Sequence, residues 1–322
     1  MDNQQHQTPI NDKTADWEKT VLEKLAFAAI EEQKTARRWG VFFKSMTFAY
    51  LLAVLAIVVY PQVETDMHSG QQHVAVVDVL GVIAQGEAAS ADTVIDGLRD
   101  AVKDKNTKAV VLNINSPGGS AVQAAYVYDE IRRQKAAHPD LPIYAVVGDI
   151  CASGGYYIAS ASDKIYVSPA SIIGSIGVIM NGFGFSNVLD KLGVERRLLT
   201  AGEHKAMLDP FLPMKEQEAK HMQGMLDEVH QQFIAAVKQG RGERLKQTPD
   251  MFSGLVWSGE TSVKLGLADD FGSVDSVARD VLGTEEKVNF TPRERLIDRL
   301  AGKFGASFAH AIGTTFNFGQ LQ

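Results

Sequence analysis

The sequence has very little cysteine, no excess of positive charge and no internal repeat. Cys151 is the only cysteine among 322 residues, which excludes an intramolecular disulfide framework. The formal net charge of −7 argues against a nucleic-acid-binding protein, because such proteins are expected to carry a basic patch. With 45% hydrophobic and 22% charged residues, the chain has the composition of a globular protein with one large domain or two small ones.

Long hydrophobic runs are absent except for residues 42–60, which are apolar apart from Lys44 and Ser45 near the start. This length fits a membrane-spanning helix, and a buried core helix is the alternative. Basic residues precede the run and acidic residues follow it, so the positive-inside rule leaves the N-terminus in the cytoplasm and the C-terminal bulk outside. We therefore expect an uncleaved, single-pass anchor at residues 41–60 of the inner (cytoplasmic) membrane, with lipid contacting residues 42–60.

The rest of the chain divides around this anchor. We expect a cytoplasmic amphipathic helix within residues 1–40, a polar, irregular tether at 61–72, a main domain at 73–283 and a C-terminal tail at 284–322. In the main domain, strand patterns alternate with helical patterns, which predicts an α/β fold with layers and a mostly parallel sheet. The predicted strands are 73–83, 108–114, 143–147, 164–167 and 196–200, and the predicted helices are 91–103, 121–136 and 215–237.

Ser153 is the first candidate for a functional residue, because it lies between the predicted strand 143–147 and a helical pattern that begins near Tyr156. Gly154 and Gly155 follow it, so another backbone can approach closely and N–H groups are free at the helix start. Such a junction suits a nucleophile with a site for developing negative charge. The alternative is a tight turn in an α/β core. Cys151 is a rival nucleophile, but the glycines follow the serine, and we expect Cys151 to pack as a small hydrophobic residue.

A serine nucleophile needs a base, and none of the eight histidines lies between Ser153 and Glu203. The segment Thr-Ala-Gly-Glu-His-Lys-Ala at 200–206 instead offers Lys205, next to His204. A serine–lysine dyad is a known variant of the catalytic triad. The lysine must be neutral to accept a proton, which requires burial to lower its pKa from about 10.4 toward about 7–8. The alternative is a solvated surface lysine.

Two further segments can complete a site. Asn-Ser-Pro-Gly-Gly at 115–119 (after Asn113 and Ile114) ends a predicted strand, where the backbone N–H groups of Gly118 and Gly119 could form an oxyanion hole with that of Gly154. Gly-Ser-Ile-Gly-Val at 174–178 places the hydroxyl of Ser175 among apolar residues, where it could hold a lysine amine.

In this order, and after an anchor, the motifs N-S-P-G-G, A-S-G-G-Y-Y-I-A, G-S-I-G-V and A-G-E-H-K-A resemble the signal peptide peptidase A family in its short bacterial form, over about residues 73–283. The resemblance implies that Ser153 is the nucleophile, Lys205 the general base and Ser175 the residue that hydrogen-bonds the lysine. It also implies an oxyanion hole from Gly154 with Gly118 or Gly119. His204 stands where many relatives have tyrosine. Residues 257–269 are similar to the family's closing pattern, with Thr261 and Ser262 in place of its usual Gln-Ala.

The resemblance further implies the fold shared by crotonases and the Clp protease proteolytic subunit, and assembly into a homo-oligomeric ring in which neighbouring protomers share the dyad. The expected substrates are residual signal peptides and other unfolded chains, with no cofactor or metal. Three other functions are alternatives for this sequence. A Ser-His-Asp peptidase would need a histidine soon after Ser153. An acyl-CoA enzyme would need CoA outside the cytoplasm. A non-catalytic ring-forming scaffold would not need all three catalytic side chains.

Overall fold

The computed structural model describes residues 12–67 and 71–292, and the chain forms two compact units, Met1–Ser69 and Gly70–Gln322. Each unit is described by itself. The predicted tail 284–322 lies outside the described residues after position 292.

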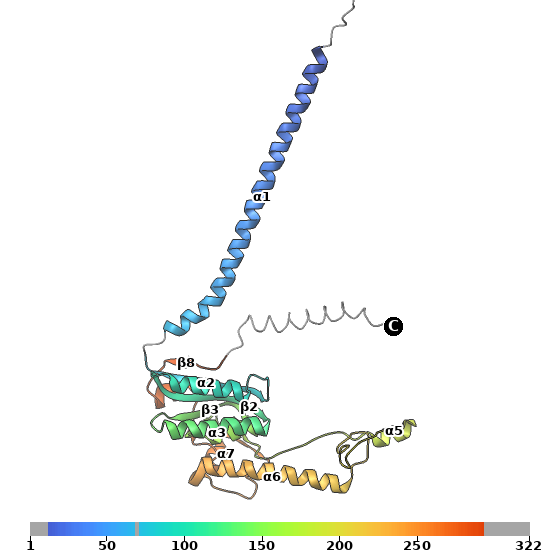
Figure 1. Ribbon diagram of the computed structural model, residues 1–322. Coiled ribbons are helices and arrows are strands. Elements are labelled where there is room, and N and C mark those ends of the chain that lie inside the picture. Colours follow the sequence, from blue (N-terminus) through green and yellow to red (C-terminus); the bar gives the residue numbers. More distant parts are fainter. Residues whose placement is uncertain (1–11, 68–70, 293–322) are drawn as a thin grey trace, which may run out of the picture. The chain divides into compact units, whose positions relative to one another are not determined.

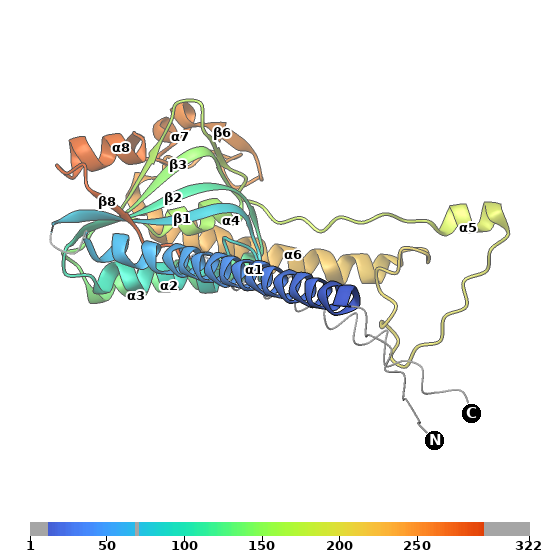
Figure 2. The ribbon, with the colours of Figure 1, turned by 90° about the horizontal axis from the view of Figure 1, so that it is seen from above.

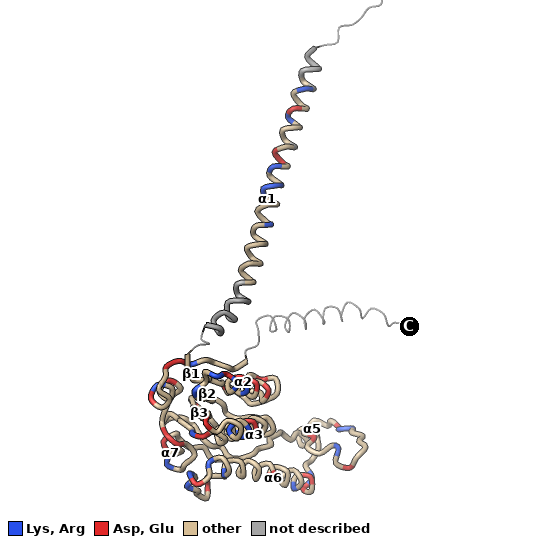
Figure 3. The backbone as a smooth tube through the Cα atoms, turned by 60° about the vertical axis from the view of Figure 1, so that its left-hand side comes forward, with Lys and Arg blue, Asp and Glu red and all other residues tan. Residues whose placement is uncertain are grey.

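The described part of the first unit is a single helix, α1 (Asp12–Met67), which continues past the predicted end of the anchor at residue 60 and into the predicted tether. Figure 3 shows charged residues along its first part and an uncharged stretch after them. Large apolar side chains between Trp39 and Leu55 are exposed. The described residues contain no helix that is long and apolar enough to cross a membrane, and the side chains at 56–60 of the predicted anchor lie outside the described ones.

The second unit is built on a mostly parallel sheet, as the sequence predicts (Figure 1). Its central strands pair in the order β6-β5-β3-β2-β1-β8, with β4 beside β3 and β7 beside β4. Among the described pairings, β5 with β6 is the antiparallel one. The strands are β1 (His73–Ile83), β2 (Thr107–Gly119), β3 (Ile143–Ala152), β4 (Lys164–Val167), β5 (Ile172–Gly174), β6 (Val256–Ser258), β7 (Asp270–Phe271) and β8 (Lys287–Asn289).

Helices cover both faces of the sheet, and Figure 2 shows α2 and α3 on one side of it and α8 on the other. The larger apolar core lies under α2, α3, α4 and α6, and a smaller one lies under residues 274–282. Ser90 and Ser120 cap α2 and α3, each with a side chain that accepts a backbone N–H. The helices are α2 (Ala91–Lys103), α3 (Ala121–Ala137), α4 (Gly154–Ser160), α5 (Ser186–Leu192), α6 (Glu216–Arg241), η1 (Gly242–Arg244), α7 (Gly259–Leu265), α8 (Val274–Ser276) and η2 (Val277–Val281).

Most predicted elements are confirmed, but three of them extend four or five residues beyond their predicted ends. β2 extends from Ile114 to Gly119, β3 from Val147 to Ala152 and α6 from Val237 to Arg241. The predicted strand at 196–200 is wrong, since these residues form no regular element. They lie in an excursion with no strand beside it, and Leu199 is fully exposed, so no neighbour supplies the hydrogen bonds that a strand requires.

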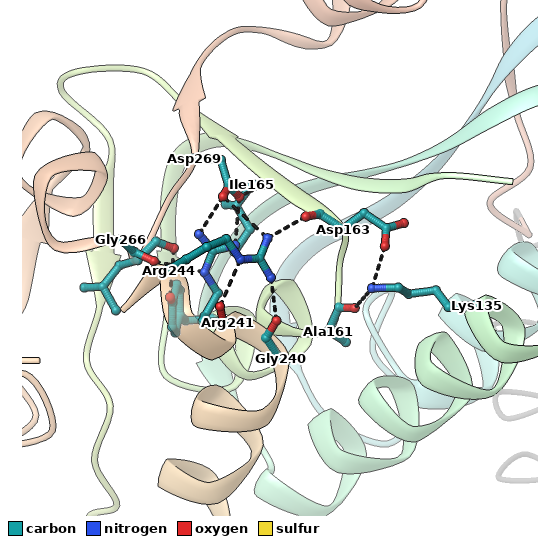
Figure 4. Close-up of polar contacts among 11 residues, drawn as sticks. Lys135, Ala161, Asp163, Ile165, Gly240, Arg241, Arg244, Gly266 and Asp269 are labelled. Atoms are coloured by element: carbon teal, nitrogen blue, oxygen red, sulfur yellow. Dashed lines mark hydrogen bonds and ion pairs between the residues drawn. The ribbon is translucent and has the colours of Figure 1, made fainter. Parts of the chain in front are cut away.

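A buried ion pair fixes the end of α6 to the sheet (Figure 4). Arg241 is only 1% exposed, and its two terminal nitrogens donate to the carboxylate of Asp269 at 2.8 and 2.9 Å. Asp269 also accepts the backbone N–H of Ile165, at 2.7 Å. Burial opposes ionisation of Asp269, but the Arg241 guanidinium keeps its pKa below the usual value. This pair joins α6, the start of β4 and the segment before β7.

Candidate active site

Ser153 lies between the last residue of β3 and the first residue of α4, as predicted, and its backbone is strained. Its φ of 51° and ψ of −122° place a non-glycine residue in a sparsely populated region, which costs about 1–3 kcal/mol. Two backbone hydrogen bonds hold it there. Its N–H donates to the carbonyl of Gly174 at 2.8 Å, and its carbonyl accepts from the N–H of Tyr157 at 2.9 Å. The fold therefore fixes the direction in which the half-buried Ser153 side chain leaves the backbone.

The end of β2 lies directly against Ser153, at two residues that must be glycine. Gly118 has a φ of +107°, and a Cβ atom there would lie 2.6 Å from the Cβ of Ser153. Gly119 has a φ of +152°, and a Cβ atom there would lie 2.2 Å from the carbonyl oxygen of Ile83. A Cβ atom on Gly154 would lie 3.3 Å from the backbone nitrogen of Gly119. The structure thus brings together all three glycines that the sequence nominates.

The hydrogen bonds distinguish between the candidate oxyanion donors. The N–H of Gly118 donates to the hydroxyl of Ser116 at 3.1 Å. The N–H of Ser120 donates to Ile83 in β1 at 2.7 Å. Because N–H groups alternate between the two edges of a strand, the N–H of Gly119 points away from β1, toward the side where Gly154 lies. The N–H of Gly154 belongs to the first turn of α4 and has no partner within the helix. Gly119 and Gly154 are therefore the better pair of donors.

Ser175 is held beside Ser153 by the pairing of two short strand ends. Ala152 of β3 pairs with Gly174 of β5, so both serines come directly after paired residues. Ser175 also has a φ of 51°, and its N–H donates to the carbonyl of Leu255 at 2.8 Å. Sequence reasoning named Ser175 but missed Gly174, which joins the two serines. The Gly-Ser-Ile-Gly motif was the available signal for it.

Cys151 is confirmed as a packed core residue. It is 0% exposed and belongs to the larger apolar core. Burial raises the pKa of its thiol, which works against the thiolate that a cysteine nucleophile requires. The rival nucleophile is therefore much less suited to catalysis than the half-exposed Ser153.

Lys205 lies elsewhere, on an extended excursion that we call the arm, residues 178–215. Figure 2 shows this segment running out from the sheet to α5 and returning to α6. Lys205 is exposed, and its Nζ atom makes no hydrogen bond or ion pair within the described part of the chain. The arm also carries an unusual number of exposed apolar side chains: Ile179, Met180, Phe183, Phe185, Val188, Leu192, Val194, Leu198, Leu199, Leu208, Phe211 and Met214. A single chain thus assembles Ser153, Ser175 and the glycines, with Lys205 set apart on the arm.

Comparisons with known proteins agree with the motifs. The model described as peptidase family S49 matches residues 135–289, which include Ser153 and Lys205, and the Clp protease model matches residues 74–173. A putative signal peptide peptidase SppA from Enterococcus faecium is 35% identical over 191 residues, which are 59% of this chain and 55% of the relative. A putative protease from Synechocystis is 30% identical over 205 residues, 64% of this chain and 72% of the relative.

Other matches are more limited in what they imply. A Brucella melitensis protein named Na(+)/H(+) antiporter NhaA is 43% identical over 198 residues, 62% of this chain but only 27% of the relative. The chain thus spans about a quarter to about half of the first curated relatives it matches. A solved structure titled as a membrane-bound stomatin-specific protease has a TM-score of 0.39 and 17% identity, over 70% of this chain and 96% of that one.

The family assignment follows from the sequence matches alone. The Synechocystis relative is matched over most of its length, and the S49 model spans the segment from α3 to β8 that contains the candidate site. The chain belongs to peptidase family S49, and its matched relatives include one named as a serine protease.

Proposed function

We propose that this chain is a serine endopeptidase in which Ser153 is the nucleophile and Lys205 the general base. The observation that carries the proposal is the strained backbone of Ser153 at the junction of β3 and α4, with glycines packed against it. Strain of this kind persists only where the surrounding structure enforces it, and it is typical of serine nucleophiles at strand-to-helix turns.

In the proposed reaction, the Oγ atom of Ser153 attacks the carbonyl carbon of the scissile peptide bond. Its proton passes to the neutral amine of Lys205, and the backbone N–H groups of Gly119 and Gly154 stabilise the resulting oxyanion. The C–N bond then breaks, and the lysine ammonium gives its proton to the leaving amine. Water repeats the sequence on the acyl-enzyme, with Lys205 again as base, and releases the second product. Ser175 accepts a hydrogen bond from the lysine and orients it.

The dyad is proposed to be shared between neighbouring protomers of a ring. Two features of the arm support this: Lys205 has no partner within the described chain, and the apolar side chains around it are exposed. An exposed apolar surface of this extent favours contact with another protein surface. A second copy of the chain that covers the arm would bury these side chains and bring Lys205 into an apolar environment, which favours the neutral amine that a base requires.

The proposed substrates are residual signal peptides and other unfolded chains at the extracytoplasmic face of the inner membrane. The proposed anchor is residues 41–60, with the N-terminus in the cytoplasm. Its support is the exposure of apolar side chains along α1 from Trp39 to Leu55, together with the basic residues that precede them. A peptidase anchored this way would meet apolar peptides that remain in or near the bilayer after secretion.

A subunit-mixing experiment tests the dyad and its sharing together. Ser153→Ala and Lys205→Ala should each abolish peptide hydrolysis by the full-length protein in detergent. If neighbouring protomers share the site, random co-assembly of the two inactive variants in equal amounts should restore activity at about a quarter of the sites. About half of the sites then have an intact serine, and about half of those receive an intact lysine from the neighbouring protomer. Full activity of Lys205→Ala would refute the dyad, and no recovery on mixing would refute the sharing.

A non-catalytic ring-forming scaffold is the alternative function. The strained Ser153 argues against it, since a scaffold gains nothing from this cost in stability. A fluorophosphonate probe separates the two functions, because it forms a covalent bond with an activated serine. We expect labelling of the wild-type protein and none of Ser153→Ala. An unlabelled wild-type protein that forms intact rings would favour the scaffold.

A further inference from the structure

Lys205 lies in a turn, residues 201–209, that has a positive φ angle near each end, and the backbone is strained at Leu208. Gly202 has a φ of +106°, and Leu208, which is not glycine, has a φ of +65°. Three backbone hydrogen bonds lie within the turn: the N–H groups of Lys205, Met207 and Asp209 donate to the carbonyl oxygens of Gly202, His204 and Ala206, each at 3.1 Å. A leucine in the left-handed region costs about 1–2 kcal/mol, so contacts from outside the turn must maintain its shape.

One such contact comes from the first turn of α6. The Nδ1 atom of His204 lies 3.3 Å from the Oε1 atom of Glu218. Within residues 71–292, this is the one side-chain hydrogen bond between the turn and α6. His204 is adjacent to Lys205 in the chain, so the bond fixes the turn at the position next to the proposed base.

The carboxylate is the buried member of this contact. The side chain of Glu218 is 7% exposed, whereas those of His204 and Lys215 are 50% and 67% exposed. Lys215 Nζ lies 3.3 Å from the same carboxylate oxygen. The hydrogen bond from His204, with a further contribution from Lys215, keeps the pKa of Glu218 below its usual value. A buried carboxylate that loses such a partner is destabilised, so Glu218 holds His204 in place.

Glu218 also lies at the wall of a cavity of about 790 Å³ between the arm and α6. The cavity lining includes Ala206 and Leu208 from the turn and Met222 from α6. Because the cavity lies between this part of the turn and the helix, packing alone leaves the turn poorly supported there. The His204–Glu218 pair bridges the two walls beside this gap.

We propose that Glu218, acting through His204, is a positioning residue for Lys205. This inference rests on the proposed function, in which Lys205 is the general base. Neither residue needs to touch the substrate. Their removal should displace the base and slow proton transfer, which lowers kcat, while substrate binding and therefore KM change little.

The test uses the full-length protein in detergent and four variants: His204→Ala, Glu218→Ala, the double variant, and Lys215→Ala as the matched control. Lys215→Ala removes the other partner of Glu218 but leaves the pair intact, so we expect near wild-type kinetics. Each single variant of the pair should lose about tenfold in kcat with KM changed less than about threefold. The double variant should be no worse than either single variant, because the two residues act as a unit.

Several results would overturn the proposal. Wild-type kcat in both single variants would do so, as would losses that multiply in the double variant. Glu218→Gln keeps an acceptor oxygen for His204, so it should recover most of the activity that Glu218→Ala loses. Failure of both Glu218 variants to assemble would assign Glu218 to folding instead. Lys205→Ala distinguishes failure of the proposed dyad from failure of the positioning role. If Lys205→Ala is fully active, the dyad is refuted. If Lys205→Ala is inactive while the His204 and Glu218 variants keep wild-type activity, only the positioning role is refuted.

Discussion

The core around Ser153 and the arm around Lys205 are stabilised in different ways. Ser153 lies where strand ends, helix starts and glycine contacts leave almost no free space, and the residues on either side of it are buried. The arm has one short helix and a row of exposed apolar side chains, among them Leu199 at 100% exposure. The comparison indicates that a single chain is sufficient to fix Ser153 against its neighbouring glycines, whereas Lys205 lies on a segment with little support from the rest of the chain, as the proposed sharing of the site would require.

The largest expected effect comes from adding a methyl group on the core side. Gly119→Ala would place a Cβ atom 2.2 Å from the carbonyl oxygen of Ile83, which forces β1 and β2 apart. We expect a loss of about 3 kcal/mol or more in the free energy of unfolding and no peptide hydrolysis. Gly182→Ala is the matched control on the arm, because a Cβ atom there meets nothing within 4 Å. Thermal unfolding of both variants checks the contrast, and equal stability would contradict it.

An intermediate effect is expected at low pH in the core. Glu130 of α3 is buried, and hydrogen bonds from Arg133, Arg99 and Gln134 outweigh the cost of burial and lower its pKa from 4.5 to about 2. A lowered pKa in the folded state means that the stabilisation is complete above the unfolded pKa, near 4.5, and is lost as the pH falls toward 2. The upper limit of this contribution is about 3 kcal/mol.

Urea unfolding between pH 7 and pH 3 measures this contribution. Glu130→Gln should be less stable than wild type at pH 7, and the difference should shrink as the pH falls. The exposed pair Glu260 and Lys264 of α7 serves as the control, because Glu260→Gln should change stability by no more than about 0.5 kcal/mol. A difference for Glu130→Gln that stays constant with pH would show that its hydrogen bonds do not depend on charge.

The smallest expected effect on stability is on the arm. Leu199→Ser removes a fully exposed apolar side chain, so unfolding should change by less than about 0.5 kcal/mol. If the arm contacts a second copy, the same substitution should weaken assembly by about tenfold, because an apolar group is no longer buried there. Analytical ultracentrifugation across a concentration series measures this. Unchanged assembly would remove Leu199 from the contact.

The sequence predicts the core well because burial leaves a clear pattern there. The strand at 73–83 and the helix at 91–103 have the observed bounds, since both alternate or repeat apolar residues with the correct period. The end of β3 was missed because Gly148 and Asp149, which are exposed, interrupt its apolar run. The strand at 196–200 was wrong because local propensity cannot report that no neighbouring strand exists.

The site shows the same limit. Ser153, Ser175 and the three glycines were found from local motifs, and the structure brings them together. The proposed positioning residue Glu218 has no local signal in the sequence, because it is an ordinary polar residue in a helical pattern and its burial comes from the arm folding back onto α6. The positive φ angles of both serines also depend on strand pairing that no single motif encodes.

The division of β3 between two partners has a mechanical consequence. Its first half pairs with β4 through Tyr144, Ala145 and Val146, and its last residues pair with β5, which is itself hydrogen-bonded to β6. The N–H of Ser153 is bonded to Gly174, and that of Ser175 to the residue before β6. Because the N–H groups of both serines are bonded into the antiparallel β5–β6 pair, we expect a displacement of this pair to move Ser153 and Ser175 together and to change their distance from the glycines at the end of β2.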